Sequence, residues 1–291
     1  MSAARAKVVP RRTVLTGGAA VALAAAHAAG AQAASFKALE RRLEGGRLGV
    51  FATNGKASLG HRADERFPMC STFKALLAAQ VLARVDAGQE TLDRMIPYGP
   101  ADMVAHAPVT GAHLDDGALS VETLCKAIVE VSDNPGANLL LKTVGGPEGF
   151  TAWLRSIGDA TTRLDRWETE LNEALPGDPR DTTTPRAMAK CYGRLFDGAV
   201  LSQSSRRRLE DWLVGATTGL QRLRKDLPDG WRAGDKTGSG ARGSTNDVAV
   251  FWPPAGPRIY VASYITGTEV PMDVRNAVLA EVGRIARAEL A

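Results

Sequence analysis

The sequence is poor in the residues that bind metals and form disulfides. It has three cysteines and four histidines among 291 residues. The cysteines are Cys70, Cys125 and Cys191, and their spacing matches no zinc site. The histidines are scattered along the chain. We therefore expect neither a metal site nor another cofactor, and the odd number of cysteines leaves at least one free thiol.

After residue 34, the sequence also lacks long apolar runs and an excess of charge of one sign. No later stretch is long and apolar enough to cross a bilayer. The chain has 36 basic and 32 acidic residues, but residues 1–34 hold four of the basic ones and no acidic one. The rest of the chain is therefore neutral. We expect no membrane span in the mature protein and find no electrostatic reason for nucleic-acid binding.

Residues 1–34 have the pattern of a signal peptide. Basic residues are followed by a run rich in alanine, valine and leucine, and Ala31-Gln32-Ala33 is a small-x-small cleavage motif. Arg11 and Arg12 precede apolar residues and resemble a twin-arginine export signal, with a general secretory leader as the alternative. We expect an exported protein, either periplasmic or secreted.

Hydrophobic periodicity predicts strands near both ends of the remaining chain and helices between them. The expected strands lie at 47–53, more weakly at 57–66, and in three segments after residue 230. The expected helices lie at 36–43, 71–86, 120–131, 135–144, 147–156, 185–197, 202–213 and 272–290. The stretch 161–184 has no apolar periodicity, which is typical of a functional loop.

This order of elements predicts an α/β (α+β) fold in two parts. One antiparallel sheet would form from both chain ends, be covered by helices, and accept an inserted all-helical domain. The α/β domain would comprise residues 35–68 and 216–291, and the helical domain residues 69–215 with the loop 163–181. A ligand cleft is expected where the two parts meet.

Three short polar motifs are expected at this cleft. Ser71 and Lys74 open a long helix, where residues three apart share one face. Ser132-Asp133-Asn134 links two helices, and Lys236-Thr237-Gly238 lies on a strand followed by Ser239. Each motif alone is common, but their order and wide separation are hard to obtain by chance.

A fourth motif, Glu168-x-x-Leu171-Asn172, lies in the long loop. With it, the sequence resembles the class A serine β-lactamases across residues 36–291. The resemblance implies the fold shared by serine β-lactamases and penicillin-binding proteins. It also implies hydrolysis of the β-lactam ring of penicillins and cephalosporins through a serine acyl-enzyme, and hence antibiotic resistance. The partners would be small-molecule β-lactams, and the protein would be a monomer.

Ser71 is the candidate nucleophile, because a hydroxyl becomes reactive when a base lies beside it. Lys74 could be that base if burial and a second cation, Lys236, lower its pKa. The backbone N–H groups of Ser71 and Ser239 could form the oxyanion hole. Ser132 is placed where it could pass a proton to the departing lactam nitrogen.

Glu168 and Asn172 are the candidates for deacylation. Residues four apart on a helical turn face the same point, so the two could hold one water, with Glu168 as its base. Whether Glu168 or Lys74 is the base for acylation stays open within the family. The resemblance also places a salt bridge between Arg166 and Asp181, near the two ends of the loop.

The resemblance assigns substrate contacts to further residues. Asn134 would bind the side-chain amide of the substrate, and His106 lies at the rim of the cleft. Some relatives support the substrate carboxylate with an arginine on a neighbouring strand, where this chain has Thr245. Others take the arginine from the segment after the helical domain, where this chain has Arg222. The residues expected to hold the carboxylate are Lys236, Thr237, Ser239 and Arg222.

The resemblance also indicates that the chain forms no disulfide. Some relatives pair the cysteine at the position of Cys125, but its partner position here is Ala78. Others pair the one at Cys70, but its partner position here is Gly240. Cys191 lies on an apolar helical stretch and is expected to be buried.

Two alternatives share the first three motifs. One is a penicillin-binding transpeptidase or carboxypeptidase, and the other is a β-lactam sensor that is acylated once and stays acylated. Both predict that no carboxylate activates water, so Glu168 in its motif argues against them. A sensor would also need a membrane span, which is not expected here.

Overall fold

The computed structural model describes residues 35–291. The predicted signal peptide, with its twin-arginine motif and cleavage site, lies outside the described residues. Among residues 35–291, no helix combines the length and the apolar character that crossing a membrane requires.

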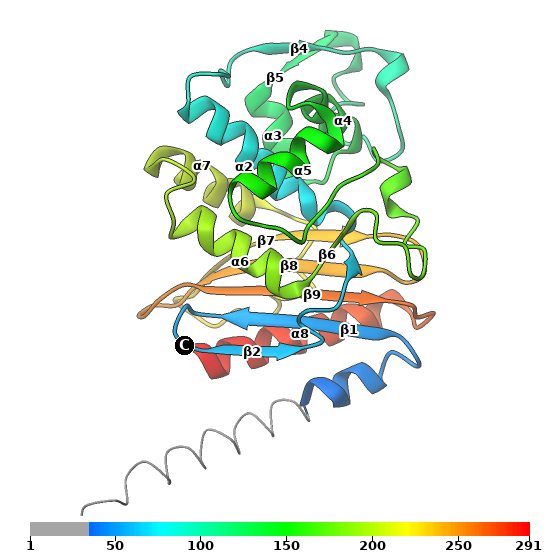
Figure 1. Ribbon diagram of the computed structural model, residues 1–291, viewed down its shortest axis with the longest axis vertical. Helices are drawn as coiled ribbons and strands as arrows, with labels where there is room; N and C mark the ends of the chain where they lie inside the picture. Colours follow the sequence, from blue (N-terminus) through cyan, green and yellow to red (C-terminus); the bar gives the residue numbers. More distant parts are fainter. Residues whose placement is uncertain (1–34) are drawn as a thin grey trace, which may run out of the picture.

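A five-stranded antiparallel sheet has the strand order β2-β1-β9-β8-β7 (Figure 1). Its strands are β1 (Arg47–Thr53), β2 (Ser58–His61), β7 (Arg232–Ser239), β8 (Thr245–Trp252) and β9 (Ile259–Thr266). Strand β1, from the N-terminal part of the chain, pairs along its whole length with β9 from the C-terminal part. The prediction of one antiparallel sheet built from both chain ends is therefore confirmed.

Strand β2 is shorter than the strand expected at 57–66. Arg62 leaves the extended conformation with a φ of 47° and donates through Nε to Glu40, at 2.7 Å. The chain then forms β3 (Phe67–Pro68), which pairs with β6 (Thr182–Thr183). This pairing brings the end of the long loop beside the chain that enters the serine motif.

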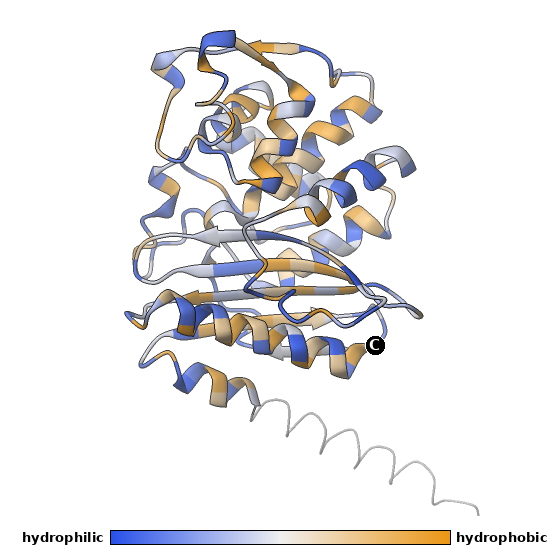
Figure 2. Ribbon diagram, turned by 180° about the vertical axis from the view of Figure 1, so that it is seen from behind, coloured by the Kyte–Doolittle hydropathy of each residue, from blue (hydrophilic) through white to orange (hydrophobic). Residues whose placement is uncertain are grey.

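Both faces of the sheet are buried, because successive residues of a strand point to opposite sides. On β9, Val261 and Ile265 belong to the apolar cluster that includes residues of α8 (Met272–Leu290). Tyr260 and Tyr264 belong to the cluster on the other face, which includes buried residues of helices α2 to α7. Figure 2 shows α8 lying along the sheet.

The central helix α2 (Phe73–Asp86) is apolar on nearly all sides because other helices surround it. Its first ten residues are all buried. The other helices are those at 35–41, α3 (Val121–Glu130), α4 (Asn134–Thr143), α5 (Gly146–Ser156), α6 (Pro185–Phe196) and α7 (Gln203–Gly215). Shorter elements are the ribbon β4 (Met95–Pro97) and β5 (Ala118–Ser120), and the 3₁₀ helices η1 (Cys70–Thr72), η2 (Pro100–Asp102), η3 (Leu114–Asp116) and η4 (Glu170–Asn172).

Helix α6 joins the helical part to the sheet. The ring of Phe196 stacks on that of Tyr260 in β9, with the centroids 6.4 Å apart. One apolar cluster runs from α2 through α6 to strands β8 and β9. The division into an α/β domain (35–68 and 216–291) and a helical domain (69–215) stays a prediction.

Candidate active site

The serine motif begins in a 3₁₀ turn that runs directly into α2. Ser71 lies in η1, and Lys74 lies in the first turn of α2. Cys70, just before the serine, has a φ of 45°, which is uncommon for a residue with a side chain. His106 and Ser132 share this left-handed conformation, with φ of 64° and 63°. Such backbone strain concentrates at functional sites, and these residues lie in or next to the wall of one cavity.

This cavity has a volume of about 280 Å³. It is lined by Ser71, His106, Ser132, Asn134, Asn172, Thr218, Arg222, Thr237, Gly238 and Ser239. Lys74, Glu168 and Lys236 are buried and hydrogen-bond to residues of this lining. The structure thus brings the predicted site residues together at this cavity, which we call the catalytic cavity.

Lys74 is fully buried and surrounded by oxygen acceptors. Its Nζ donates to the backbone oxygen of Ser132 at 2.8 Å and to Oδ1 of Asn134 at 2.5 Å. It also lies 3.0 Å from Oε1 of Glu168. Burial lowers the pKa of Lys74, and the charge of Glu168 opposes that effect. Ser71 Oγ donates to the same Oε1 at 3.2 Å, so nucleophile, lysine and carboxylate meet at one oxygen.

The hydroxyl of Ser132 links the two lysines. Lys236 donates through Nζ to Ser132 Oγ at 3.0 Å, and Lys74 Nζ lies 3.4 Å from the same atom. Lys236 is fully buried in β7 and also donates to the carbonyl of Thr237. Burial, and next the charge of Lys74, lower the pKa of Lys236 to about 7. A hydroxyl held between two such ammonium groups is well placed to relay a proton.

Glu168 is oriented by hydrogen bonds to its side chain and to its backbone. Asn172 Nδ2 donates to Oε2 of Glu168 at 2.6 Å, which confirms that the two side chains face each other. Asn138 accepts from the Glu168 N–H at 3.0 Å and donates to the Glu168 carbonyl at 2.9 Å. The sequence analysis missed Asn138; the available signal was its position four residues after Asn134, on the same face of α4.

The predicted salt bridge at the base of the loop is confirmed. Arg166 Nε lies 2.6 Å from Oδ2 of Asp181, which is 1% exposed. The other oxygen of Asp181 accepts the backbone N–H groups of Asp165 and Arg166, at 2.8 and 3.0 Å. Glu173 also pairs with Arg166. The loop that carries Glu168 is therefore closed by a buried carboxylate.

Arg222 comes from the chain before β7 and lines the catalytic cavity. Its guanidinium donates to the carbonyls of Gly238 and Asn246, at 3.1 and 2.7 Å, and to Ser239 Oγ at 2.9 Å. It is 7% exposed and lines the cavity, so it orients the Ser239 hydroxyl while presenting positive charge. Thr245 accepts from Arg275, which places a second guanidinium nearby.

Three further hydrogen bonds shape the rim. Thr218, which sequence reasoning missed, hydrogen-bonds to Thr237 between their hydroxyls at 2.7 Å. His106 is exposed, and its carbonyl accepts the Asn134 N–H at 3.0 Å. Asn134 Nδ2 donates to the carbonyl of Ala105 at 2.8 Å. The loop of His106 therefore positions the asparagine through its backbone.

The three cysteines are buried free thiols. Cys70 adjoins the site, and burial raises its pKa to about 12. A Cβ added to Gly240 would lie 2.7 Å from its sulfur, so the two positions are close although only one carries a thiol. Within residues 35–291, no group of histidine, cysteine and carboxylate side chains is arranged to hold a metal ion.

Comparisons with known proteins agree with this geometry. The model of the beta-lactamase enzyme family matches residues 32–290. Beta-lactamase AST-1 of Nocardia asteroides is 51% identical over 243 residues, covering 83% of this chain and 78% of its own. Beta-lactamase L2 of Stenotrophomonas maltophilia is 48% identical over 257 residues, covering 87% and 84%.

Solved structures give the same result. The ancestral class A β-lactamase of the last common ancestor of Gram-negative bacteria superposes with a TM-score of 0.86 and 56% identity, covering 88% of this chain and 99% of that one. The class A β-lactamase PenP of Rhodopseudomonas palustris, described as putative, superposes with a TM-score of 0.85 and 52% identity, covering 89% and 98%.

Proposed function

Because this chain belongs to the class A β-lactamases, serine hydrolases that open the β-lactam ring of antibiotics and confer resistance, we propose roles for its site residues. Ser71 attacks the lactam carbonyl, and Glu168 activates the water that releases the product. The observation that carries this proposal is the meeting of Ser71, Lys74 and Glu168 at one carboxylate oxygen.

Acylation needs a base for the Ser71 proton. Ser71 Oγ donates directly to Glu168, and Lys74 shares the same oxygen, so carboxylate and lysine act as one proton-accepting unit. The charge of Glu168 raises the pKa of Lys74, opposing burial. Removal of that charge would lower the pKa of Lys74 further, so more of it would be the neutral amine that can accept the Ser71 proton, and acylation would continue without Glu168.

Collapse of the tetrahedral intermediate requires a proton on the lactam nitrogen. Ser132 is the donor, because its hydroxyl lines the catalytic cavity and is itself hydrogen-bonded by Lys236. The backbone N–H groups of Ser71 and Ser239 stabilise the oxyanion. A proton can then return to Ser132 from either lysine.

The substrate is held by groups on two sides of the cavity. Thr237, Ser239 and Lys236 bind its carboxylate, and Arg222 adds charge and fixes the Ser239 hydroxyl. Asn134 binds the side-chain amide, and His106 borders the opening.

Deacylation distinguishes a hydrolase from a transpeptidase or a sensor. Asn172 and Glu168 are joined at 2.6 Å, and both side chains reach the catalytic cavity or its wall. A water held by these two groups faces the ester on Ser71, and Glu168 takes its proton.

We propose that the enzyme works as a monomer, exported to the periplasm or beyond by a cleaved leader at residues 1–34.

Turnover of the chromogenic cephalosporin nitrocefin tests this proposal. Continuous hydrolysis with many turnovers per enzyme is expected, and Ser71→Ala should abolish it. A single stoichiometric burst would indicate a sensor or a transpeptidase. Turnover that survives in Ser71→Ala would show that another group is the nucleophile.

A further inference from the structure

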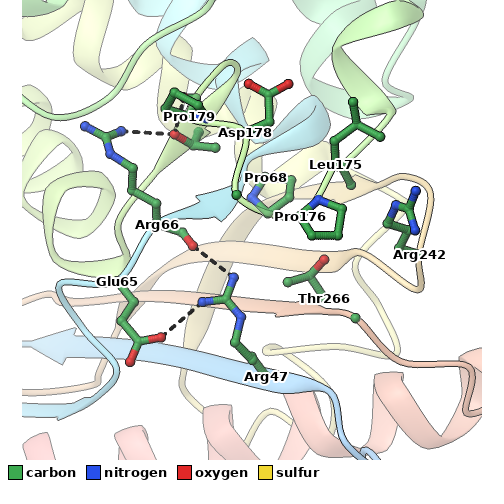
Figure 3. A pocket seen from close by; sticks show the side chains of 14 residues that line it. Arg47, Glu65, Arg66, Pro68, Leu175, Pro176, Asp178, Pro179, Arg242 and Thr266 are labelled. Carbon is green, nitrogen blue, oxygen red and sulfur yellow. Dashed lines mark hydrogen bonds and ion pairs between the residues drawn. The ribbon is translucent and has the colours of Figure 1, made fainter.

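A second cavity lies beneath the loop that carries Glu168 and shares no lining residue with the catalytic cavity (Figure 3). Its volume is about 460 Å³, within the usual range for small-molecule sites. One wall is the loop segment 174–179. The other walls come from the start of β1, the segment 65–68, Thr182, the end of β9 and the turn between β7 and β8. We call it the subloop pocket.

The subloop pocket has an apolar side. Pro68, Leu175 and Pro176 line it, and Figure 3 shows Leu175 and Pro176 next to one another on the loop side. Leu175 is 38% exposed, which is high for a large apolar side chain in this molecule. A Cβ added to Gly177 would meet no atom within 4 Å, so there is open space along this segment. An apolar group could be buried here without displacing any side chain.

In the described part of the chain, the acidic side chains that line the pocket are in ion pairs, but not all of its arginines are. Arg47, at one end, is paired with Glu65 at 3.0 Å. Asp178 is paired with Arg180 outside the lining, and that hydrogen bond holds its pKa at about 2. Arg242 is exposed at the end opposite Glu65, and within residues 35–291 its guanidinium has no hydrogen bond or ion pair.

Arg66 adds to the positive potential. Its guanidinium donates to two neutral oxygens, the carbonyl of Thr161 and the hydroxyl of Thr182, each at 3.0 Å. With Glu65 and Asp178 already paired, the pocket favours an anion, and Arg242 is the group with free donors to receive it.

From this arrangement we propose that the subloop pocket binds a small monocarboxylate that carries an apolar body. The carboxylate contacts the guanidinium of Arg242, and the apolar body packs against Leu175 and Pro176. A bound ligand would bridge two segments that also border the catalytic cavity. The Ala241 N–H, next to Arg242, donates to the carbonyl of Asn172 at 2.9 Å.

Calorimetric titration with 4-phenylbutyrate tests the proposal. We expect saturable binding to the wild type and no comparable binding of the neutral analogue 4-phenylbutan-1-ol. Arg242→Gln should weaken the affinity about tenfold, because a charge-assisted hydrogen bond is lost. Leu175→Ala should weaken it less. Arg207→Gln, at an exposed arginine on α7, is the matched control and should not change it.

Three results of the titration would overturn the proposal: no saturable binding, equal binding of the alcohol, or unchanged affinity in Arg242→Gln. Competition distinguishes this pocket from the catalytic cavity. If 4-phenylbutyrate inhibits nitrocefin hydrolysis competitively, with an inhibition constant equal to its dissociation constant, it occupies the catalytic cavity and the proposal is wrong. The titration does not depend on the roles proposed for Ser71 or Glu168, so it can succeed or fail separately from them.

Discussion

Two buried lysines lie within reach of the Ser132 hydroxyl, and their desolvation governs the chemistry of the site. Burial is the largest effect on both, and it lowers each pKa. Lys74 has Glu168 as its counter-ion, while Lys236 faces the like charge of Lys74. One lysine is therefore held close to a carboxylate, and the other is poised to lose its proton near neutral pH.

This difference predicts a pH dependence for substrate capture. Below pH about 7, Lys236 is a cation that attracts the substrate carboxylate; above its pKa that attraction is lost. We expect kcat/KM to fall as the pH rises above about 7, mainly through KM. Lys236→Arg is the control, because a guanidinium stays charged and should remove this decline. If kcat/KM declines in the same way in the wild type and in Lys236→Arg, the titrating group is not Lys236.

Arg222→Ala should act mainly on binding. Arg222 presents charge to the catalytic cavity and holds Ser239 Oγ at 2.9 Å. A contact made in both ground and transition states changes KM more than kcat, so KM should rise about tenfold to a hundredfold. Steady-state kinetics should show no such change for Arg207→Ala. An unchanged KM for every substrate would show that another residue binds the substrate carboxylate.

Among the elements, the long loop depends most on a single side chain. Asp181 accepts two backbone N–H groups and the guanidinium of Arg166 while almost fully buried. The backbone of Glu168 is held separately by Asn138. Asp181 thus fastens the loop at its base, and Asn138 fastens it at its catalytic residue.

Asp181→Asn should therefore loosen the loop at its base. We expect a loss of about 2–4 kcal/mol in the free energy of unfolding, and slower deacylation because Glu168 is held less firmly. Denaturant unfolding and penicillin turnover measure the two effects. Asp178→Asn breaks an exposed pair in the same loop and should change neither by much. Wild-type turnover of every penicillin by Asp181→Asn would contradict this account.

Local sequence signals account well for the regular elements. Ser120, Thr184 and Ser202 each cap a helix through a side-chain oxygen, which is why α3, α6 and α7 begin where the sequence predicts. Asp133 caps α4 in the same way. The 3₁₀ turn before α2 could not be predicted, since it depends on the left-handed Cys70 and on packing against β7.

On the scale of the whole molecule, the two ends of the chain complete one sheet. Strand β1 pairs with β9, and the Asn54 side chain donates to the Leu290 carbonyl at 2.8 Å. The site draws on the middle of the chain through Ser71 and Glu168 and on the C-terminal part through Lys236. We therefore expect the sheet and the active site to unfold together in one cooperative transition.

The sequence located the four motifs because each one is a short local pattern. It did not reveal Thr218 or the subloop pocket, since these depend on which segments the fold brings together. The spacing of Asn138 from Asn134 was visible in the sequence, but its contact with the backbone of Glu168 was not. The pocket, for example, combines the loop 174–179 with the turn at Arg242, which are far apart along the chain.

The buried cysteines report on this cooperative unfolding. All three thiols are buried, and burial raises the pKa of each, so the native protein should resist alkylation. In denaturant without a reductant, mass spectrometry should show three alkylated cysteines appearing together. A linked pair would contradict the expectation of no disulfide, and early labelling of one cysteine would show that part of the fold opens separately.

The central claim is that Glu168 is the base for deacylation, and Glu168→Ala tests it most directly. Intact-protein mass spectrometry after mixing with a penicillin should show the variant carrying one drug mass on Ser71, because Lys74 still supports acylation. This adduct should persist long after the wild type has returned to free enzyme. Glu170→Ala, at an exposed glutamate two residues away, is the matched control and should clear its adduct like the wild type. Turnover by Glu168→Ala at nearly the wild-type rate would contradict the account.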